Sequence, residues 1–292
     1  MRHIIPISGK DSLATALVQL KRQPDLPYEY MFNPTGAELP EVFDWINKVE
    51  LYLGKEIIRV GENLEDIIED YNFFLPSGQA RYCTRQSKIQ PMEKWIGKDE
   101  CTIYYGIRAD EVRKGYVNPS GRITVVLPLD EENINIDGVY EIINHHGLKP
   151  PTFFWKQVYD KVCKIIGGES VLKSLLKDWQ IDMIFAWRSR ANCYFCYNQR
   201  QYEWCGLLEY HPDLFWNAES MEHKGGEKTY SWNSNRTLRW IYENKESIVD
   251  KRVKSIVKII DKLKQGEMNF NNNEDGFNDV LSTASCGLFC GK

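Results

Sequence analysis

The chain has 292 residues, of which 42% are hydrophobic and 13% aromatic, so it is long enough to bury one main core. Its formal net charge of −4, from 37 basic and 41 acidic residues, argues against a protein that coats nucleic acid with an evenly basic surface. No apolar run is long enough to span a bilayer, and no signal segment is recognised, so we expect a cytoplasmic protein without a membrane partner.

Short apolar runs alternate with amphipathic stretches over the first hundred residues. The runs predicted as strands are His3–Ile7, Glu29–Phe32, Glu56–Val60 and Thr102–Ile107. Apolar residues recur at spacings of three and four in the predicted helices, which are Asp11–Lys21, Pro40–Leu53, Leu64–Tyr71 and Arg85–Ile96. Alternating strands and helices predict an α/β fold with a doubly wound parallel sheet.

From Gly121 onward, the alternation of apolar runs and amphipathic stretches is less regular. A helical stretch over Lys156–Trp179 is expected to break at Gly167 and Gly168. We expect residues 1–150 to form the nucleotide-binding core. We expect residues 151–225 to complete it as a helical insertion and a cysteine-rich region that cover the ligand edge of the sheet.

The C-terminal part divides into two further regions. Within 226–265 a long amphipathic helix is predicted over Arg236–Lys264, with nine basic and four acidic residues. Its basic face indicates an ordinary solvated surface, with nucleic-acid binding as the alternative. The polar composition that follows predicts a flexible linker and a cysteine tail over 266–292.

A tight turn follows the first predicted strand and contains Ser8, Gly9, Lys10, Asp11 and Ser12. Such a turn presents backbone N–H groups and hydroxyls at the positive end of a helix, which suits a phosphate group. The Walker sequence is absent, because its two-glycine frame is missing. The alternative is an ordinary capped turn between a strand and a helix. In either case we expect Lys10 and Asp11 to lie on the surface rather than in the core.

This turn resembles the PP-loop, written SGGKDS in the phosphoadenosine-phosphosulfate (PAPS) reductase-like family, although Ile7 and Ser8 replace the first Ser-Gly of that motif. Three further stretches resemble the same family. The second-strand element FxDTGxELPET is matched at Asn33, Thr35, Gly36, Glu38 and Pro40, with Asn33 in place of Asp. The Arg-x-Cys-Thr element is matched at Arg81, Cys83, Thr84, Lys88 and Pro91. The fourth-strand element is matched at Gly106, Arg108, Glu111 and Arg113.

The resemblance implies an adenine nucleotide, ATP or PAPS, bound with Mg²⁺ at these motifs. Ser8 to Ser12, Asn33, Thr35, Gly36, Arg108 and Arg113 would bind it. Lys10 and Arg108 or Arg113 would neutralise the charge that grows as pyrophosphate leaves. Asp11 would hold the Mg²⁺ or orient the loop. For the two arginines, a surface ion pair with Asp110 and Glu111 is the alternative.

The chain contains eight cysteines, whose spacing in a reducing compartment indicates metal or redox chemistry rather than disulfides. Cys193, Cys196 and Cys205 form a Cys-x₂-Cys-x₈-Cys array, which leaves one position of a tetrahedral or cubane site open. Cys83 is the predicted fourth ligand, because its loop belongs to the same edge of the sheet. Cys101 and Cys163 are interpreted as core thiols.

The one-plus-three cysteine pattern resembles the [4Fe–4S] ligands of the DNA-phosphorothioation sulfurtransferases. A structural Zn²⁺ is the alternative, since zinc accepts the same four thiolates. The tail motif SCGLFCGK resembles the Cys-Gly-Leu/Ile-His ending of the reductases, with Phe289 in place of His and Cys290 added. Cys286 is therefore a candidate catalytic thiol for sulfur or electron transfer. A role in closing a metal site, or none, is equally open for this tail.

The leading hypothesis is a PP-loop ATP pyrophosphatase that activates a substrate at the α-phosphate and transfers sulfur with an iron–sulfur or other cysteine-ligated centre. A nucleic acid is a candidate substrate, and a cysteine desulfurase or thioredoxin is a candidate sulfur or electron donor. One alternative is a reductase of a sulfonucleotide such as PAPS. Another is a non-catalytic nucleic-acid-binding or complex subunit that keeps the fold.

Overall fold

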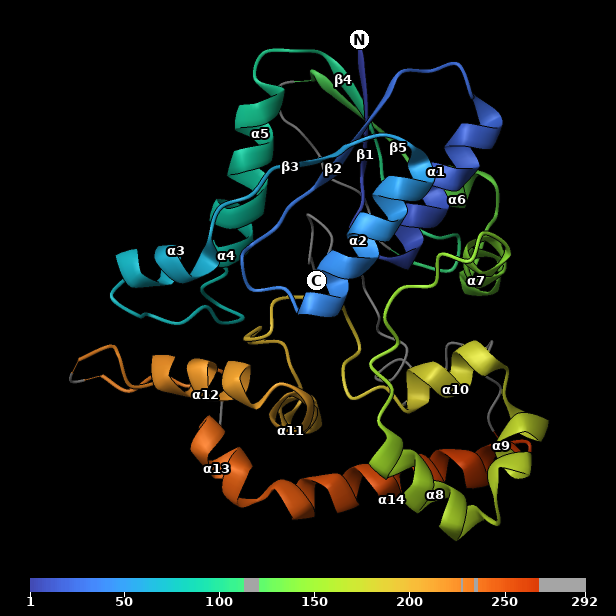
Figure 1. Ribbon diagram of the computed structural model, residues 1–292, viewed down its shortest axis with the longest axis vertical. Helices are drawn as coiled ribbons and strands as arrows, with labels where there is room; N and C mark the ends of the chain where they lie inside the picture. The colour runs from blue at the N-terminus through green and yellow to red at the C-terminus, as the bar shows by residue number, and fades with distance from the viewer. Residues whose placement is uncertain (113–120, 227, 234–235, 268–292) are drawn as a thin grey trace.

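The computed structural model describes residues 1–112, 121–226, 228–233 and 236–267, and a sheet of five parallel strands lies in the upper part of the view in Figure 1. The strands are β1 (Arg2–Pro6), β2 (Tyr28–Phe32), β3 (Ile57–Arg59), β4 (Cys101–Tyr104) and β5 (Ile123–Val126). They lie in the order β3-β2-β1-β4-β5, and every neighbouring pair is parallel. The predicted α/β class with a parallel sheet is confirmed.

Helices cover both faces of the sheet, which explains why the central strand is apolar on both sides. Ile5 belongs to a large core on one face, together with side chains of α1 (Lys10–Arg22) and α2 (Pro40–Leu53). Ile4 faces the other way and packs with Met92 and Ile96 of α5 (Gln90–Ile96) in a second, smaller core. The sheet is therefore doubly wound.

The strand order reverses direction between β1 and β4. The chain runs outward from β1 through β2 to β3 and then returns to the opposite side of β1 to form β4 and β5. In open α/β sheets, ligands bind outside the carboxyl ends of the strands at such a switch point. The residues that directly follow β1 and β4 are Ile7 to Gly9 and Tyr105 to Arg108, so the fold brings two of the sequence motifs to the same place.

The helix predicted over Arg85–Ile96 is longer and contains a wide turn. Three successive helical segments, α4 (Tyr82–Thr84), the π-helical turn η1 (Arg85–Ile89) and α5, follow α3 (Leu64–Asp70). Pro91 has no N–H to donate to the carbonyl of Ser87, and that carbonyl accepts the backbone N–H of Glu62 instead, at 3.1 Å. The missing donor accounts for the local departure from α-helical bonding.

Two other expectations need correction. Strand β5 lies at the edge of the sheet, where only part of its surface is covered, and its weak apolar pattern did not predict it. The single helix expected over Arg236–Lys264 is two helices, α13 (Leu238–Glu243) and α14 (Lys245–Lys264). Asn244 separates them, because its side-chain amide donates to the carbonyl of Trp240 and stops the first helix.

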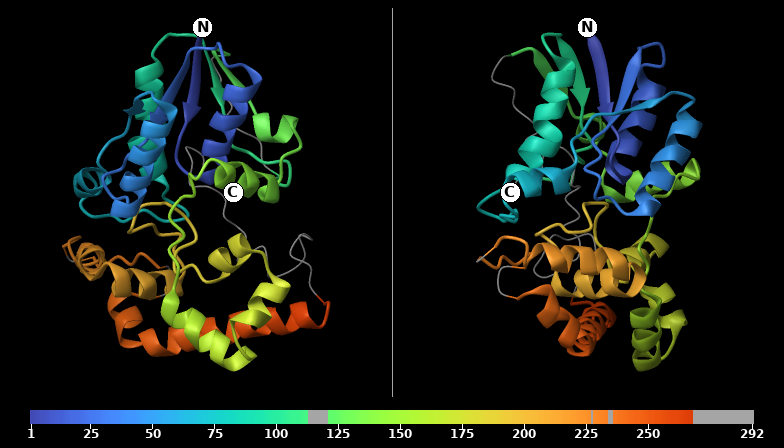
Figure 2. Two further views of the ribbon diagram at one scale, coloured as in Figure 1. Left: turned by 45° about the vertical axis from the view of Figure 1, so that its right-hand side comes forward. Right: turned by 60° about the vertical axis from the view of Figure 1, so that its left-hand side comes forward.

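The C-terminal half of the described chain forms a helical layer beyond the carboxyl ends of the strands (Figures 1 and 2). After α6 (Pro128–Glu131) and α7 (Ile136–His145) come α8 (Lys156–Ile166), α9 (Glu169–Leu175), α10 (Asp178–Ile184), α11 (Gln201–Tyr210) and α12 (Pro212–Met221). The break between α8 and α9 falls at the predicted glycine pair. Helix α14 packs against α8, α9 and α11 with Ile248, Val249, Val253, Ile256 and Ile260.

The large core continues without interruption from the sheet into this helical layer, since Ile5 and Ile260 belong to the same cluster of buried side chains. Among the residues that the structure describes, no helix has the length and apolar character needed to cross a membrane.

Candidate functional site

The turn between β1 and α1 is closed by its own last side chain. The Oγ atom of Ser12 accepts hydrogen bonds from the backbone N–H groups of Ser8 at 2.9 Å and Gly9 at 3.1 Å, and it donates to the carbonyl of Gly9 at 2.9 Å. Gly9 precedes the helix in an extended conformation with a φ of 178°. Ser8, which stands where the motif has its other glycine, does not adopt a positive φ, so this position does not require glycine.

The first turn of α1 supplies the positive end of a helix to this loop. Backbone N–H groups in the first turn have no carbonyl four residues earlier to bind, and the first bond of this kind in α1 joins the N–H of Leu13 to the carbonyl of Gly9. The amides of Lys10, Asp11 and Ser12 precede it. The helix N-terminus therefore favours an anionic group beside the loop.

Asp11 lies in the core of the site, and the expectation that it sits on the surface is wrong. Its side chain is 1% exposed, and its two oxygens bind Lys10 Nζ at 3.0 Å and Arg108 Nη1 at 3.1 Å. Burial alone would raise the pKa of Asp11, but the two cations outweigh it and hold that pKa below its ordinary value. Asp11 is therefore a carboxylate whose charge links α1 to the loop after β4.

Arg108 is surrounded by carboxylates rather than exposed to a ligand. It is 5% exposed and binds Asp110 at 2.9 Å and Glu111 at 3.5 Å in addition to Asp11. Burial opposes its charge, but the three acids together raise its pKa above the ordinary value. The ion pairs with Asp110 and Glu111 exist as the alternative interpretation expects, although Arg108 itself is buried and only Asp110 lies at the surface.

Gly106 allows the end of β4 to approach the start of α1. A Cβ atom at this position would lie 2.6 Å from the backbone carbon of Asp11 and 2.6 Å from the nitrogen of Ser12. Real Cβ atoms do not approach backbone this closely, so the site requires glycine here. The glycine of the fourth-strand motif therefore has a steric role in joining the two loops.

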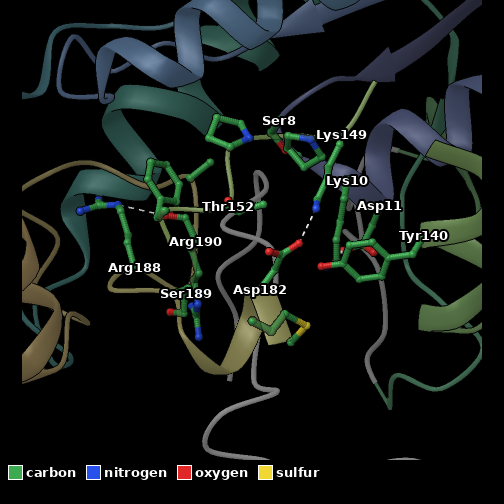
Figure 3. A pocket seen from close by; sticks show the side chains of 17 residues that line it. Ser8, Lys10, Asp11, Tyr140, Lys149, Thr152, Asp182, Arg188, Ser189 and Arg190 are labelled. Atoms are coloured by element: carbon green, nitrogen blue, oxygen red, sulfur yellow. Dashed lines mark hydrogen bonds and ion pairs between the residues drawn. The ribbon is translucent and has the colours of Figure 1, made fainter. Parts of the chain in front are cut away.

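A cavity of about 120 Å³ opens beside the loop, between the sheet and the helical layer (Figure 3). Its first wall is made by Ser8, Gly9, Lys10 and Asp11. The opposite walls come from outside the motifs, namely Tyr140, Lys149 to Phe153, Asp182, Met183, Ala186 and Arg188 to Ala191. Cationic groups and apolar side chains thus share one cavity.

The two far walls of this cavity are tied to each other by backbone pairing. The N–H of Trp187 donates to the carbonyl of Phe153 at 2.9 Å, and the N–H of Trp155 donates to that of Phe185 at 2.7 Å. Arg188, which is 1% exposed, donates to the carbonyl of Arg190 at 3.0 Å and to the side chain of Gln199 at 3.1 Å. These bonds fix the loop between α10 and α11 without any ligand.

The predicted nucleotide-binding residues after β2 do not line this cavity. Asn33 donates its side-chain amide to the carbonyl of Val60, and thereby joins the ends of β2 and β3. The hydroxyl of Thr35 donates to Glu38 at 2.7 Å, and Gly36 adopts a φ of 74° that favours glycine. These three residues shape the neighbouring loop. Arg113 lies outside the described residues.

The predicted metal ligands divide into separate environments. Cys193 is buried, lies 3.2 Å from the hydroxyl of Thr35, and has its pKa raised by burial, with Lys88 and Cys196 among the groups that act on it. Burial raises the pKa of Cys205 to about 12, and the charged groups that act on it are Lys245 and Glu209. Cys196 is thus among the groups that act on Cys193, whereas the groups that act on Cys205 include no other cysteine.

In the part of the chain that the structure describes, no three or more His, Cys, Asp or Glu side chains are arranged to hold a metal ion. The iron–sulfur centre therefore stays a prediction. The oxygens of Asp11 bind Lys10 and Arg108, and Mg²⁺ binding by Asp11 stays a prediction as well. Of the remaining predicted thiols, Cys286 and Cys290 lie outside the described residues.

The two cysteines interpreted as core thiols lie where that interpretation places them. Cys101 is fully buried in the smaller core at the start of β4. Cys163 is partly buried in α8 and packs against the large core. Burial raises the pKa of both thiols, so neither is activated as a nucleophile.

Seven polar residues of the cavity were not predicted from the sequence, namely Tyr140, Lys149, Thr152, Asp182, Arg188, Ser189 and Arg190. They are separated from the loop by more than a hundred residues, and none belongs to a recognised motif. Pro150 and Pro151 were a usable signal, since a proline pair fixes the backbone of its neighbours and can present an adjacent side chain rigidly.

Comparisons with known proteins add a distant structural likeness. No protein-family model matches the chain, and no curated protein matches it. Among solved structures it is similar to a phosphoadenylyl-sulfate (PAPS) reductase from Candida auris in a phosphate complex. That likeness has 16% sequence identity and a TM-score of 0.39, and it covers 52% of this chain and 74% of that one. Because it is so weak, the fold class rests on the parallel strand order described above.

Proposed function

We propose that the chain is a PAPS reductase-like PP-loop enzyme that binds ATP in this cavity and cleaves it at the α-phosphate. The observation that carries the proposal is the meeting of two PP-loop-like segments at the switch point of the sheet. Asp11 of the first segment and Arg108 of the second form a buried ion pair beside a cavity that Lys10 lines. Nucleotide sites of doubly wound folds lie at this position.

The cavity offers different surroundings to the two ends of a nucleotide. The phosphates would lie at the N-terminus of α1, where Lys10 and first-turn amides favour negative charge. The base would lie against apolar side chains such as Pro151, Phe153 and Met183, which line the same cavity. This division between a charged wall and an apolar wall supports a nucleotide rather than a free inorganic anion.

In the proposed reaction, an oxygen of the substrate forms a bond to the α-phosphorus while the bond from that phosphorus to pyrophosphate breaks. Negative charge grows on the leaving pyrophosphate, and the ammonium of Lys10 would compensate it. We assign Arg108 a positioning role, because its contacts with three carboxylates hold Asp11, and Asp11 in turn holds Lys10. Asp11 then orients the loop, which is the second of the two roles considered for it.

The sulfur-transfer half of the proposal rests on the cysteine pattern. The adenylylated substrate would lose AMP when a sulfur nucleophile attacks it, with sulfur supplied by a partner such as a cysteine desulfurase. No step is assigned to an iron–sulfur centre. A reductase acting on PAPS would use the same cavity with a thioredoxin-like electron donor, so the bound nucleotide distinguishes the two reactions.

Replacement of Lys10 by Ala is expected to weaken ATP binding at least tenfold, because the variant loses a charged donor at the phosphate position. Isothermal titration calorimetry with ATP and with PAPS measures the effect, and release of pyrophosphate from ATP measures turnover. Lys156→Ala is the matched control, since Lys156 is 72% exposed and pairs with Asp160 on the outside of α8.

Unchanged ATP affinity in Lys10→Ala would rule out the loop as the nucleotide site. Binding of PAPS with thioredoxin-dependent formation of sulfite would select the reductase. Binding of DNA or RNA without nucleotide turnover would select the non-catalytic subunit.

Replacement of Cys83 by Ser is expected to remove the metal predicted by the cysteine pattern, because a site that loses one ligand binds its metal more weakly. Iron, zinc and acid-labile sulfide in anaerobically prepared protein provide the measurement. Cys101→Ser is the control, since this thiol lies in the core. Metal that survives in Cys83→Ser but is lost on truncation before Cys286 would instead assign the fourth ligand to the tail.

A further inference from the structure

Lys149 lies across the cavity from the loop and is held in place from both sides along the chain. The residue before it, Leu148, is buried, and its carbonyl accepts the indole N–H of Trp45 at 2.9 Å. The residues after it are Pro150 and Pro151, which restrict the backbone of Lys149 to extended conformations. The position of this side chain is therefore set by the core on one side and by a rigid segment on the other.

The partner of Lys149 is equally well anchored. Lys149 Nζ forms an ion pair with a carboxylate oxygen of Asp182, on α10 (Figure 3). Helix α10 is fixed against α7, because Trp179 stacks on Tyr140 at 4.8 Å and donates its indole N–H to Asp137 at 3.0 Å. The ion pair thus joins two walls of the cavity, although the side chains of Lys149 and Asp182 are 41% and 23% exposed.

Both lysines of the cavity keep hydrogen-bonding capacity for a ligand. An ammonium group has three donors. Among the described residues, Lys10 Nζ binds only Asp11, and Lys149 Nζ binds only Asp182. Tyr140 lines the same cavity, and burial together with the charges of Asp11 and Asp182 raises its pKa. The cavity therefore places two partly satisfied ammonium groups and a phenol around one space.

We propose that Lys149 is a second anion-binding residue of this cavity, and that Asp182 competes with the anion for it. The inference rests on the proposed function and specifies it: the ligand carries a phosphate chain or an equivalent polyanion that contacts Lys10 and Lys149 together. Binding replaces the ion pair between Lys149 and Asp182, in full or in part, by a contact between Lys149 and a phosphate oxygen.

The competition gives the two members of the pair opposite effects on affinity. Removing the lysine deletes a charge-assisted hydrogen bond to the ligand. Removing the charge of the aspartate frees the lysine and takes a negative charge out of the cavity. A pair that merely stabilised the fold would not produce this reversal of sign, because either change would break the same bond.

The experiment measures binding of ATP, inorganic pyrophosphate and adenosine by isothermal titration calorimetry. Lys149→Ala is expected to weaken the binding of ATP and of pyrophosphate about tenfold and to leave the affinity for adenosine unchanged. Asp182→Asn is expected to increase the affinity for ATP and for pyrophosphate severalfold. Lys149→Arg should retain most of the affinity. Lys156→Ala and Asp160→Asn alter a similar ion pair on the outside of α8. They should leave the affinities for ATP and pyrophosphate unchanged.

Several outcomes separate this inference from the proposed function. If Lys10→Ala abolishes ATP binding and Lys149→Ala does not change it, the second anion-binding residue is refuted and the nucleotide site stands. If pyrophosphate binds in a Lys149-dependent way but ATP does not bind, the anion site stands and the ATP enzyme is refuted. Weaker pyrophosphate binding in Asp182→Asn overturns the competition, and wild-type protein that binds neither ligand overturns both proposals.

Discussion

Replacement of Asp11 by Ala should lower the free energy of unfolding by about 3 kcal/mol, because it leaves buried Arg108 without one of its three acidic partners. The carboxylate is 1% exposed, so solvent cannot replace it as a partner. The same change frees Lys10, and ATP affinity should fall with stability. Thermal and urea denaturation measure the first effect, and calorimetric titration measures the second.

The pH dependence of this effect has a definite sign. The pKa of Asp11 lies below its ordinary value of 3.8 in the folded protein, so its stabilising contribution is fully present above that value. The contribution is lost as the pH falls through the lower pKa of the folded state. The stability difference between wild type and Asp11→Ala should therefore be constant near neutral pH and shrink in acid.

A matched control for Asp11 is Asp160→Ala, which removes a carboxylate from a pair that is 54% exposed on the aspartate side. Exposed ion pairs contribute little to the free energy of unfolding, so the stability of Asp160→Ala should stay close to that of wild type. Equal stabilities of Asp11→Ala and Asp160→Ala would mean that the buried network at the switch point does not hold α1 to the loop after β4.

Replacement of Gly106 by Ala should cost about 2 kcal/mol of stability or more and abolish measurable ATP binding. The added Cβ would meet backbone atoms of Asp11 and Ser12 at 2.6 Å, and backbone cannot yield as the end of a side chain can. The strand and the helix would have to separate, which would displace Asp11 from Arg108. Denaturation and titration with ATP report the two consequences.

Gly78→Ala tests whether this penalty comes from the contact rather than from the loss of a glycine. A Cβ at Gly78 meets no atom within 4 Å, and the residue has no left-handed φ. Its substitution should leave both stability and affinity near wild type. Retention of ATP affinity in Gly106→Ala would show that the nucleotide does not depend on the approach of β4 to α1.

Much of the sheet could be predicted because its signals are local. The helix Pro40–Leu53 begins and ends where the sequence predicts, with proline in its first turn and Gly54 in a left-handed conformation at its end. Strand β2 was predicted to within one residue. Strand β5 was not predicted, because it is an edge strand of only four residues whose side chains are no more than partly buried.

The site was predictable only in part, because its polar contacts join distant segments. The sequence indicated Lys10, Asp11 and Arg108, but it did not indicate that Asp11 is buried, since burial depends on β4 returning beside β1. Lys149 and Asp182 are brought to the loop by the packing of α7 against α10. Nothing in the residues next to Lys149 and Asp182 identifies them as partners, apart from the two prolines.

The backbone pairing between residues 153–155 and 185–187 affects how a ligand can enter and leave. Two walls joined in this way cannot swing apart like independent flaps. Widening of the opening would then require the two walls to move as a unit relative to the β1–α1 loop. Ligand exchange would then be governed by the loop that binds the phosphates, so that a tightly held phosphate chain would also slow its own release.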